Sequence, residues 1–486
     1  MRRLAPGAVG LVLLGLLAAG CGSGTSHGAP PSAQGSQTAL EADTTAYDAA
    51  LSTPREDSVY PSVGDPGVDA LHYGLQLSWD PGHSQLTATE SVLFRAATTA
   101  DHLQLDLARQ LQVGKVWLDG TPVAFQHDGK DLVVQAPMKS GDRHVLQLTY
   151  AGTPEPVRAP TDRSDFDTTG WTTTADGTVW TMQEPYGAYS WYAVNDQPSD
   201  KAFYDISISA PSPMVGVANG RMLARTTQGG HTVTRWQLAD PAASYLVTIG
   251  IGRYTETHDT GPHGLPITYW TPASQPSTLQ RVRYTPEAIA YLESKVGPYP
   301  FPTLGVLVVP SHSAMETQST ITLGETRYTL TRDVLVHELA HQWYGDSVTP
   351  GDWSDLWMSE SMALYLAEGS WTADHGPDSL DRILHGWDVQ ASFMRSMWGP
   401  PARYHPGSFG EGNVYYLPAL MWDEVRQRVG TDEFWRLARE WLATHRFTSQ
   451  DRATVVAWWS RRTGQDLRPL FHAWLLGAHQ PAWHAG

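Results

Sequence analysis

The sequence predicts a multidomain α+β protein, in which an amino-terminal antiparallel β domain, a saddle or a sandwich, precedes a mainly helical domain with a small sheet. Three observations support this fold class. The 486 residues are 41% hydrophobic, which gives room for two or three domains with large cores. Residues 60–255 carry apolar side chains at a period of two, interrupted by turn residues. Residues 256–486 carry mainly helical signals instead.

The period of two is clearest over residues 73–79, where Tyr, Leu, Leu and Trp alternate with Gly, Gln and Ser. Such alternation places one face of a strand against a core and the other toward solvent. Further short runs of the same kind are Ser91–Phe94, Leu103–Leu107, Lys115–Leu118, Leu132–Gln135 and Val145–Tyr150. We expect each run to be a strand of the amino-terminal domain, residues 60–255.

The second half combines helices with a short sheet. Thr285-Pro286-Glu287 predicts the start of a helix, because proline fits the first helical turn. The apolar run over residues 304–310 predicts a strand, and residues 414–429 and 434–443 predict two helices. We therefore expect a second domain over residues 256–486.

The amino terminus predicts a secretory signal of the lipoprotein type over residues 1–20. Two arginines precede an apolar run over residues 8–19, which is too short for a membrane span of about 20 residues. Cys21, the single cysteine, follows Ala-Ala-Gly, and this segment resembles the bacterial lipobox, whose cysteine is lipidated. We expect a lipoprotein anchored through Cys21 to the outer face of the bacterial cell membrane. The alternative is an ordinary cleaved signal and an extracellular protein.

Composition adds two expectations. Residues 21–59 are rich in small and polar residues with few large apolar side chains, so they predict a flexible tether. The formal net charge of −17 argues against a nucleic-acid partner, which would favour a basic patch. The same charge is compatible with cationic or amino-terminal ligands, although it does not identify one.

A metal site is indicated by His337, Glu338, His341 and Glu360. Two histidines four residues apart lie on one face of a helix, so both imidazoles can reach one cation. Glu360 follows after eighteen intervening residues, inside a second predicted helix, Trp357–Tyr365. Two histidines and one carboxylate leave a fourth position open, which is the arrangement of catalytic zinc. Glu338 can then act on a water at that position.

The wider segment reads His337-Glu-Leu-Ala-His-Gln-Trp-Tyr-Gly-Asp-Ser-Val-Thr349, followed by Trp353, Asp355, Trp357 and Glu360. This segment resembles the M1 aminopeptidase family of zinc metallopeptidases, the gluzincins. Tyr60–Gly67, His72-Tyr73 and Asn195–Ala202 resemble the amino-terminal domain of that family. The resemblance implies a thermolysin-like zinc-peptidase domain over residues 256–486, one zinc ion per chain and an aminopeptidase N-like activity. Large members carry a long further helical domain, which we expect to be absent.

The resemblance also implies residues that bind the substrate. Ser313-Ala314-Met315-Glu316-Thr317 is similar to the family's Gly-Ala-Met-Glu-Asn motif, an edge strand that pairs with the substrate backbone and whose glutamate binds the free amine. Ala314, Met315 and Glu316 are therefore predicted to contact substrate, and Ser313 and Thr317 depart from the motif. Glu184 matches a polar position that helps to hold the same amine, and its neighbour Gln183 is an alternative.

Tyr415 is the predicted oxyanion-stabilising tyrosine. It lies in Val414-Tyr-Tyr-Leu-Pro-Ala-Leu420, which is similar to the family's Val-Tyr-Glu-Lys-Gly-Ala segment, and Tyr416 is the fallback. Asp346 and Asp355 match family positions near the ligands. They either orient a ligand histidine or cap a helix.

The favoured hypothesis is a secreted zinc aminopeptidase that cleaves the first peptide bond of peptides with a free amino terminus. Glu338 would be the general base and Tyr415 would stabilise the oxyanion. Two alternatives use the same scaffold: a zinc endopeptidase, if the altered 313–317 segment does not bind an amine, and a non-catalytic surface-binding protein. The sequence makes no prediction about oligomeric state, the preferred amino-terminal residue or the physiological substrate.

Overall fold

The computed structural model describes residues 44–484. The predicted signal, Cys21 and the first part of the predicted tether lie outside the described residues. Among the residues described, no helix is both long and apolar enough to cross a membrane.

The amino-terminal half is built from three sheets. The largest has eight strands in the order β14-β15-β12-β1-β2-β8-β4-β5, with antiparallel neighbours except for the parallel pair β1 and β12. Its strands are β1 (Val68–Asp80), β2 (Gln85–Ala96), β4 (Leu111–Leu118), β5 (Thr121–Pro122), β8 (Arg143–Gly152), β12 (Lys201–Pro211), β14 (Arg221–Gln228) and β15 (His231–Ala243). Each predicted run falls within or overlaps a strand of this half.

Two smaller sheets complete this half. One has the order β13-β16-β11-β10-β9 and the other β3-β7-β6. Their strands are β3 (Ala100–Asp106), β6 (Phe125–Asp128), β7 (Asp131–Met138), β9 (Val157–Arg158), β10 (Thr168–Thr173), β11 (Val179–Met182), β13 (Val215–Ala218) and β16 (Ile249–Gly252). The strands pack on one another through a large aromatic and aliphatic core, and Tyr73, Leu75, Leu77 and Trp79 of β1 all point into it.

The carboxy-terminal half begins with a mixed five-stranded sheet in the order β17-β18-β19-β21-β20. Its strands are β17 (Tyr254–Thr260), β18 (Pro266–Pro272), β19 (Leu304–Val309), β20 (Ala314–Met315) and β21 (Thr320–Gly324). The two-residue strand β20 is the last in the order and pairs antiparallel with β21 alone. The predicted domain boundary at residue 255 falls within β17.

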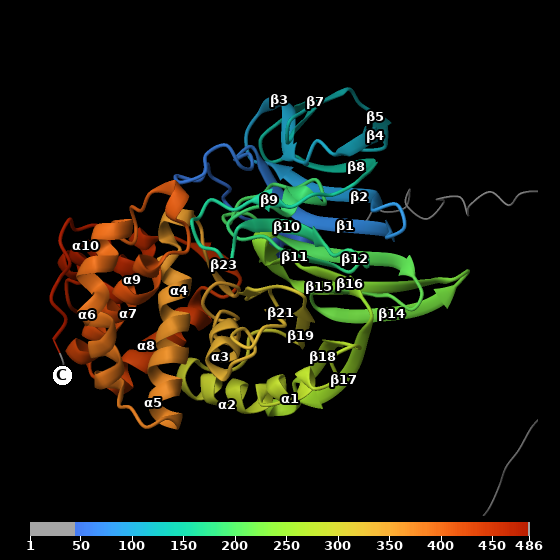
Figure 1. The fold of residues 1–486 in the computed structure, drawn as a ribbon. Helices are drawn as coiled ribbons and strands as arrows, with labels where there is room; N and C mark the ends of the chain where they lie inside the picture. Colours follow the sequence, from blue (N-terminus) through green and yellow to red (C-terminus); the bar gives the residue numbers. More distant parts are fainter. Residues whose placement is uncertain (1–43, 485–486) are drawn as a thin grey trace, which may run out of the picture. The chain divides into compact units, whose positions relative to one another are not determined.

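Helices form most of the remaining chain, and Figure 1 shows α4 and α6 to α10 gathered beside the sheets. The helices are α1 (Thr278–Val282), α2 (Thr285–Val296), α3 (Arg332–Ala340), α4 (Trp357–Leu364), α5 (Thr372–His375), α6 (Leu380–Trp398), α7 (Gly412–Val429), α8 (Thr431–Thr444), α9 (Arg452–Thr463) and α10 (Arg468–Leu475). A π-helical turn over Tyr365–Trp371 continues α4, and β22 (Val348–Pro350) pairs with β23 (Thr448–Gln450). A second core, distinct from the first, lies among these helices and the mixed sheet.

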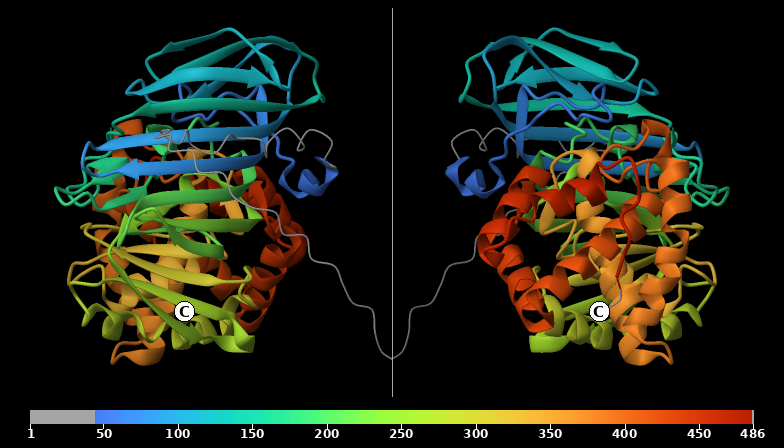
Figure 2. Two further views of the ribbon diagram at one scale, coloured as in Figure 1. Left: turned by 90° about the vertical axis from the view of Figure 1, so that its right-hand side faces the viewer. Right: turned by 90° about the vertical axis from the view of Figure 1, so that its left-hand side faces the viewer.

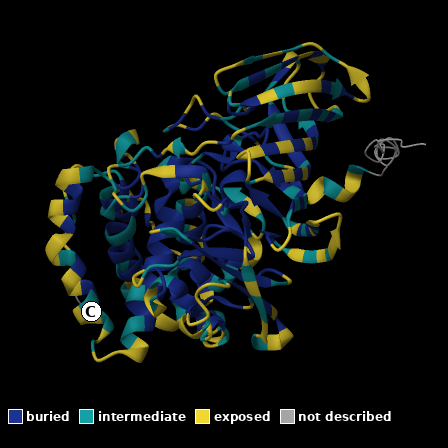
Figure 3. Cartoon of the chain, turned by 45° about the vertical axis from the view of Figure 1, so that its right-hand side comes forward, coloured by how far each residue is buried: buried dark blue, intermediate teal, exposed yellow. Residues whose placement is uncertain are grey.

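The two halves of the described chain share an extensive contact. Figure 2 shows the amino-terminal strands, blue to green, lying over the yellow to red carboxy-terminal part. Buried residues fill the region between them in Figure 3. Lys201 at the start of β12 is one buried link, because its ammonium donates to the carbonyl oxygen of Asp346 at 2.7 Å.

The structure differs from the predicted tether over residues 44–59. Thr44–Ala50 form a 3-10 helix, and Asp57 is buried and accepts hydrogen bonds from the backbone of Tyr60 and Trp353. Arg55 donates to the carbonyl oxygen of Gly351 at 2.9 Å. Composition missed this segment because a few polar bonds and single apolar contacts attach it, such as Ala50 and Tyr47 against Leu71 and Leu93.

Candidate metal and peptide-binding site

The helix α3 supplies two of the predicted metal ligands. Thr331 is its N-cap, and the side chain of this residue accepts a hydrogen bond from the backbone N–H of Val334. His337 lies in the last turn and His341 directly follows the helix, one turn apart on the same face. The local sequence therefore fixes the relative position of both imidazoles.

Glu360 of α4 meets these histidines. Its Oε2 lies 3.3 Å from Nε2 of His337 and 3.4 Å from Nε2 of His341, and the two imidazole nitrogens are 3.1 Å apart. Donor atoms at about 2.0–2.2 Å from a tetrahedral zinc ion are about 3.3–3.5 Å from one another. Within residues 44–484, Glu360 Oε2 is also buried without a hydrogen-bond donor. The donor set and its spacing thus fit zinc.

The pKa shifts in this cluster also favour a bound cation. Burial opposes ionisation of Glu360, but His341 and His337 hold the pKa of its carboxyl below the usual value. Burial also disfavours the charged form of His341, yet Glu360 and Glu316 raise the pKa of this imidazole well above its usual value. Closely spaced carboxylates and imidazoles of this kind are stabilised by a cation placed among them.

The partner of His341 is a backbone carbonyl. Its Nδ1 lies 3.0 Å from the carbonyl oxygen of Tyr344, which orients the ring and directs Nε2 toward Glu360. Among the residues described, neither carboxylate of the two predicted aspartates bonds to a ligand side chain, although the backbone N–H of Asp346 donates to the carbonyl oxygen of His341 at 3.0 Å. Asp346 accepts from the amide of Gln342 at 2.6 Å, and Asp355 accepts from the backbone N–H of Arg452 at 2.8 Å. Both therefore have structural partners.

Glu316 and Glu184 form a second group of carboxylates beside the metal ligands. One oxygen each of Glu184, Glu316 and Glu360 lies within 4.8 Å of the others. Both Glu184 and Glu316 are buried, and each has an Oε1 without a hydrogen-bond partner in the part of the chain that the structure describes. Burial raises the pKa of both carboxyls, and the repulsion from Glu316 adds to the shift for Glu184. A cationic ligand between them would relieve both effects.

Gln183 does not share this position. Its Nε2 donates to the carbonyl oxygens of Ser244 and Val247 at 2.8 and 2.7 Å, and its Oε1 accepts from the indole of Trp191 at 2.9 Å. The side chain is buried and does not line the cavity. Its predicted role as an amine ligand is therefore wrong, since its hydrogen-bonding groups are already used within the fold.

The altered motif segment forms an edge strand beside the cavity. Ala314 and Met315 form β20, whose other edge is not paired with any described strand, and Ser313 to Glu316 line the cavity. The side-chain amide of Gln342 donates to the carbonyl oxygen of Glu316 at 2.9 Å and holds this segment against the metal-binding region. Thr317 is buried and bonds instead to Thr320 and Thr322.

Tyr415 and Tyr416 both line the cavity from α7. The Tyr415 hydroxyl lies 3.3 Å from Nη1 of Arg163, and its ring centroid is 6.1 Å from that of His337. Burial raises the pKa of Tyr415 well above its usual value, so the phenol keeps its proton. Tyr416 instead pairs with Glu368. Of the two tyrosines, Tyr415 is the one with a ring contact to a predicted ligand among the described residues, and its role at the oxyanion stays a prediction.

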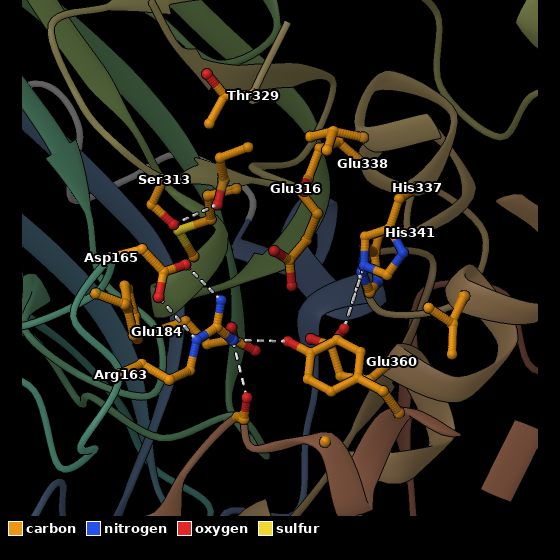
Figure 4. Close-up of a pocket in the computed structure, with 18 of the residues that line it drawn as sticks. Arg163, Asp165, Glu184, Ser313, Glu316, Thr329, His337, Glu338, His341 and Glu360 are labelled. Carbon is orange, nitrogen blue, oxygen red and sulfur yellow. Dashed lines mark hydrogen bonds and ion pairs between the residues drawn. The ribbon is translucent and has the colours of Figure 1, made fainter. Parts of the chain in front are cut away.

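The cavity joins these groups in one space of about 280 Å³. Figure 4 shows Glu316 and Glu184 on the side of it opposite the histidines, with Arg163 and Asp165 beside Glu184 at the left. Glu338 lines the same cavity and is buried, which raises the pKa of its carboxyl. Sequence reasoning missed Arg163, Asp165 and Glu368, because nothing in their local sequence marks them.

Comparison with known proteins agrees with this geometry. The description "Peptidase M1 N-terminal domain" matches residues 69–246 and "Peptidase family M1 domain" matches residues 281–395. Together the two matches cover more than half of the chain. The chain belongs to the M1 peptidase family.

Individual M1 relatives are distant in sequence. Tricorn protease-interacting factor F2 of Thermoplasma acidophilum is 23% identical over 450 residues, which are 86% of this chain and 54% of that protein. Aminopeptidase N of Streptomyces lividans is 22% identical over 446 residues, 84% of this chain and 50% of the relative. The chain therefore spans about half the length of these curated relatives.

A solved structure matches nearly end to end. A mutant of an M1 zinc metallopeptidase from Deinococcus radiodurans, bound to a Tyr-Ser-Ala substrate, superposes with a TM-score of 0.80 at 25% identity. The match covers 88% of this chain and 98% of the other. The predicted fold class, an amino-terminal β domain followed by a helical peptidase domain, is confirmed.

Proposed function

We propose that this chain is a zinc-dependent aminopeptidase that hydrolyses the first peptide bond of peptides with a free amino terminus. The observation that carries the proposal is the pair of buried carboxylates, Glu184 and Glu316, beside the zinc-type donors His337, His341 and Glu360. A peptidase that cuts at any bond needs no such pair. An ammonium group at the end of a peptide supplies the cation that these carboxylates lack.

Each residue of the site has a separate role in the proposed reaction. His337, His341 and Glu360 would hold one zinc ion, which when bound makes water more acidic and polarises a carbonyl group. Glu338 accepts the proton of the attacking water and then returns it to the leaving amine. Tyr415 donates a hydrogen bond to the carbonyl oxygen as that oxygen gains negative charge.

The position of the substrate follows from β20 and the two carboxylates. An extended peptide can add to the free edge of β20, so that backbone hydrogen bonds align it along the cavity. Glu316 and Glu184 hold its ammonium at one end. This fixes the distance from the amino terminus to the bond that is cut. The D. radiodurans relative, bound to a tripeptide, supports this type of ligand.

The test compares three substrates with the full-length zinc-loaded protein. These are an aminoacyl-coumarin, its N-acetylated form and a quenched peptide blocked at both ends. We expect cleavage of the free-amine substrate alone. Glu316→Ala should lower kcat/KM by about 10²-fold, close to 3 kcal/mol, with unchanged zinc content. Glu256→Ala is the matched control, because Glu256 lies in β17, outside the cavity lining, and pairs with Arg225.

Two results would contradict the proposal in different ways. Equal cleavage of acetylated, blocked and free substrates would indicate an endopeptidase. Stoichiometric zinc without any hydrolysis would indicate a binding protein on a peptidase scaffold. We further propose, from the sequence alone, that the protein is secreted and anchored through a lipid on Cys21, which lies outside the described residues.

A further inference from the structure

One wall of the cavity comes from the amino-terminal half of the chain. The strands β9 and β10 pair antiparallel, with Arg158 opposite Thr168, so residues 159–167 form a hairpin loop. This loop reaches the segment that precedes α7. The backbone N–H of Phe409 donates to the carbonyl oxygen of Pro160 at 3.2 Å, and this contact holds the loop beside the cavity.

Arg163 in this loop is fixed at both ends of its guanidinium group. Nε and Nη2 donate to the two oxygens of Asp165 at 3.2 and 2.7 Å. Nη1 donates to the carbonyl oxygen of Gly410 at 2.8 Å and approaches the Tyr415 hydroxyl at 3.3 Å. The side chain is 29% exposed. A planar fork with two of its edges bound cannot rotate, so Nη1 stays directed at the phenol oxygen. Figure 4 shows Arg163 beside Asp165.

The contact with Arg163 determines whether the Tyr415 hydroxyl accepts or donates its hydrogen bonds. Within the described part of the chain, Arg163 is the one hydrogen-bond partner of the Tyr415 hydroxyl. A guanidinium group only donates, so the phenol oxygen accepts from it and its own hydrogen is left to donate elsewhere. The cavity lies on that side, since both residues line it.

We infer that Arg163 is a positioning residue for the proposed reaction, which holds the Tyr415 hydroxyl so that its hydrogen points to the carbonyl oxygen of the substrate. The inference rests on the proposed function. Arg163 thereby makes the amino-terminal half of the chain part of the oxyanion site. Without Arg163 the Tyr415 hydroxyl can rotate about its C–O bond. Its O–H must then be oriented toward the carbonyl oxygen of the substrate in each turnover, at a cost in entropy.

A double-mutant cycle tests whether Arg163 acts through Tyr415. Loss of an oxyanion donor costs about 10²–10³-fold in kcat, so we expect that range for Tyr415→Phe. Arg163→Met should lower kcat by about 10-fold or more, with KM within about twofold. In the Tyr415→Phe background, Arg163→Met should cost less than about threefold, because there is no hydroxyl left to position. Binding of an α-aminophosphinic dipeptide, a tetrahedral analogue, should weaken in parallel with kcat/KM.

The controls separate positioning from stability. Tyr60→Phe removes another bond between the halves, from its hydroxyl to the carbonyl oxygen of Pro406 at 2.8 Å, and should leave kcat unchanged. If Arg163→Met does not fold, the cycle is repeated with Asp165→Asn and with Arg163→Lys. Each should lower kcat in part, and this loss should vanish in the Tyr415→Phe background. Melting temperature and zinc content are measured for every variant.

The outcomes are distinguishable. An inactive zinc-loaded native protein overturns the proposed function and this inference together. If the native enzyme is active and the fold-losses in kcat of Arg163→Met and Tyr415→Phe multiply in the double variant, the inference alone is overturned. A rise in KM without a change in kcat overturns it as well, since Arg163 would then bind the substrate in its ground state.

Discussion

Glu338 is the residue on which the proposed chemistry depends most directly. It is buried, lines the cavity and has one oxygen within 4.8 Å of donor atoms of Glu316 and His341. Glu338→Gln keeps the shape and removes the proton acceptor. We expect zinc to remain bound and kcat to fall by several orders of magnitude, because the base and acid roles are lost together. Metal analysis and steady-state kinetics check this.

Glu368→Gln is the comparison for that variant. Glu368 also lines the cavity, and burial raises the pKa of its carboxyl to about 7, but it pairs with Tyr416. We expect its loss to change kcat by less than about tenfold, since nothing in the mechanism passes through it. If Glu338→Gln and Glu368→Gln behave alike, the carboxyl at 338 is not the proton acceptor.

The local motif predicted the two histidines and Glu360 that the structure brings together, whereas the residues around them were only partly predictable. Helix periodicity alone brings His337 and His341 together. Glu184 and Gln183 are neighbours in the chain, and only the tertiary structure shows that Gln183 is bonded to the backbone of residues 244 and 247. Arg163 contacts Tyr415 across 252 positions, so no local pattern could reveal the pair.

At the scale of elements, α3 depends on its N-cap. It is nine residues long, and isolated helices of that length are marginal. Thr331→Ala removes the capping oxygen and should lower the free energy of unfolding by about 1 kcal/mol. Because fraying of this short helix reaches His337, the affinity for zinc should also fall. Chemical denaturation and competition with a chelator measure the two effects.

Ser379→Ala serves as the matched control for that prediction. Ser379 caps α6 in the same way and accepts from the backbone N–H of Arg382 at 3.4 Å. Its loss should cost a similar free energy of unfolding and leave zinc affinity unchanged, because α6 carries no ligand. Equal effects of both variants on zinc affinity would refute the link between the α3 cap and the metal site.

Elements with a strong periodic pattern were predicted well, and their pairing was not. The alternation over residues 73–79 identified β1, but the parallel pairing of β1 with β12 depends on a partner more than a hundred positions away. Residues 44–59 belong to the segment 21–59 that was predicted to be a tether because it has few large apolar side chains. Their attachment depends on single bonds, such as Ser58 to Asp352 at 2.6 Å, that no compositional rule detects.

For the whole molecule, zinc should contribute to stability as well as to activity. Several carboxylates and the imidazole of His341 are buried beside the half-buried His337, and a cation that binds only the folded state stabilises it by about 4 kcal/mol at 1,000 times its Kd. Removal of zinc by a chelator should therefore lower the melting temperature. His341→Ala should bind no zinc, and its melting temperature should not respond to chelator. A response of equal size would place the metal elsewhere.

The proposed location of the protein depends on Cys21, which lies outside the described residues. Cys21→Ser should abolish lipid attachment and move the protein from the membrane fraction to the medium or to an uncleaved precursor. Fractionation and the mass of the native amino terminus measure this. The control is Thr25→Ala, which lies beyond the segment that resembles the lipobox and should leave fractionation unchanged. Unchanged fractionation of Cys21→Ser without an acyl mass would exclude the lipoprotein.

The free edge of β20 has a consequence for self-association. Unpaired strand edges on protein surfaces are templates on which other chains aggregate. This edge is two residues long, and its residues line a cavity instead of a flat surface. The strand edge of another folded molecule cannot enter this cavity, but the end of an extended peptide can. The chain can thus keep an open backbone edge for ligands without the risk of aggregation that such an edge usually carries.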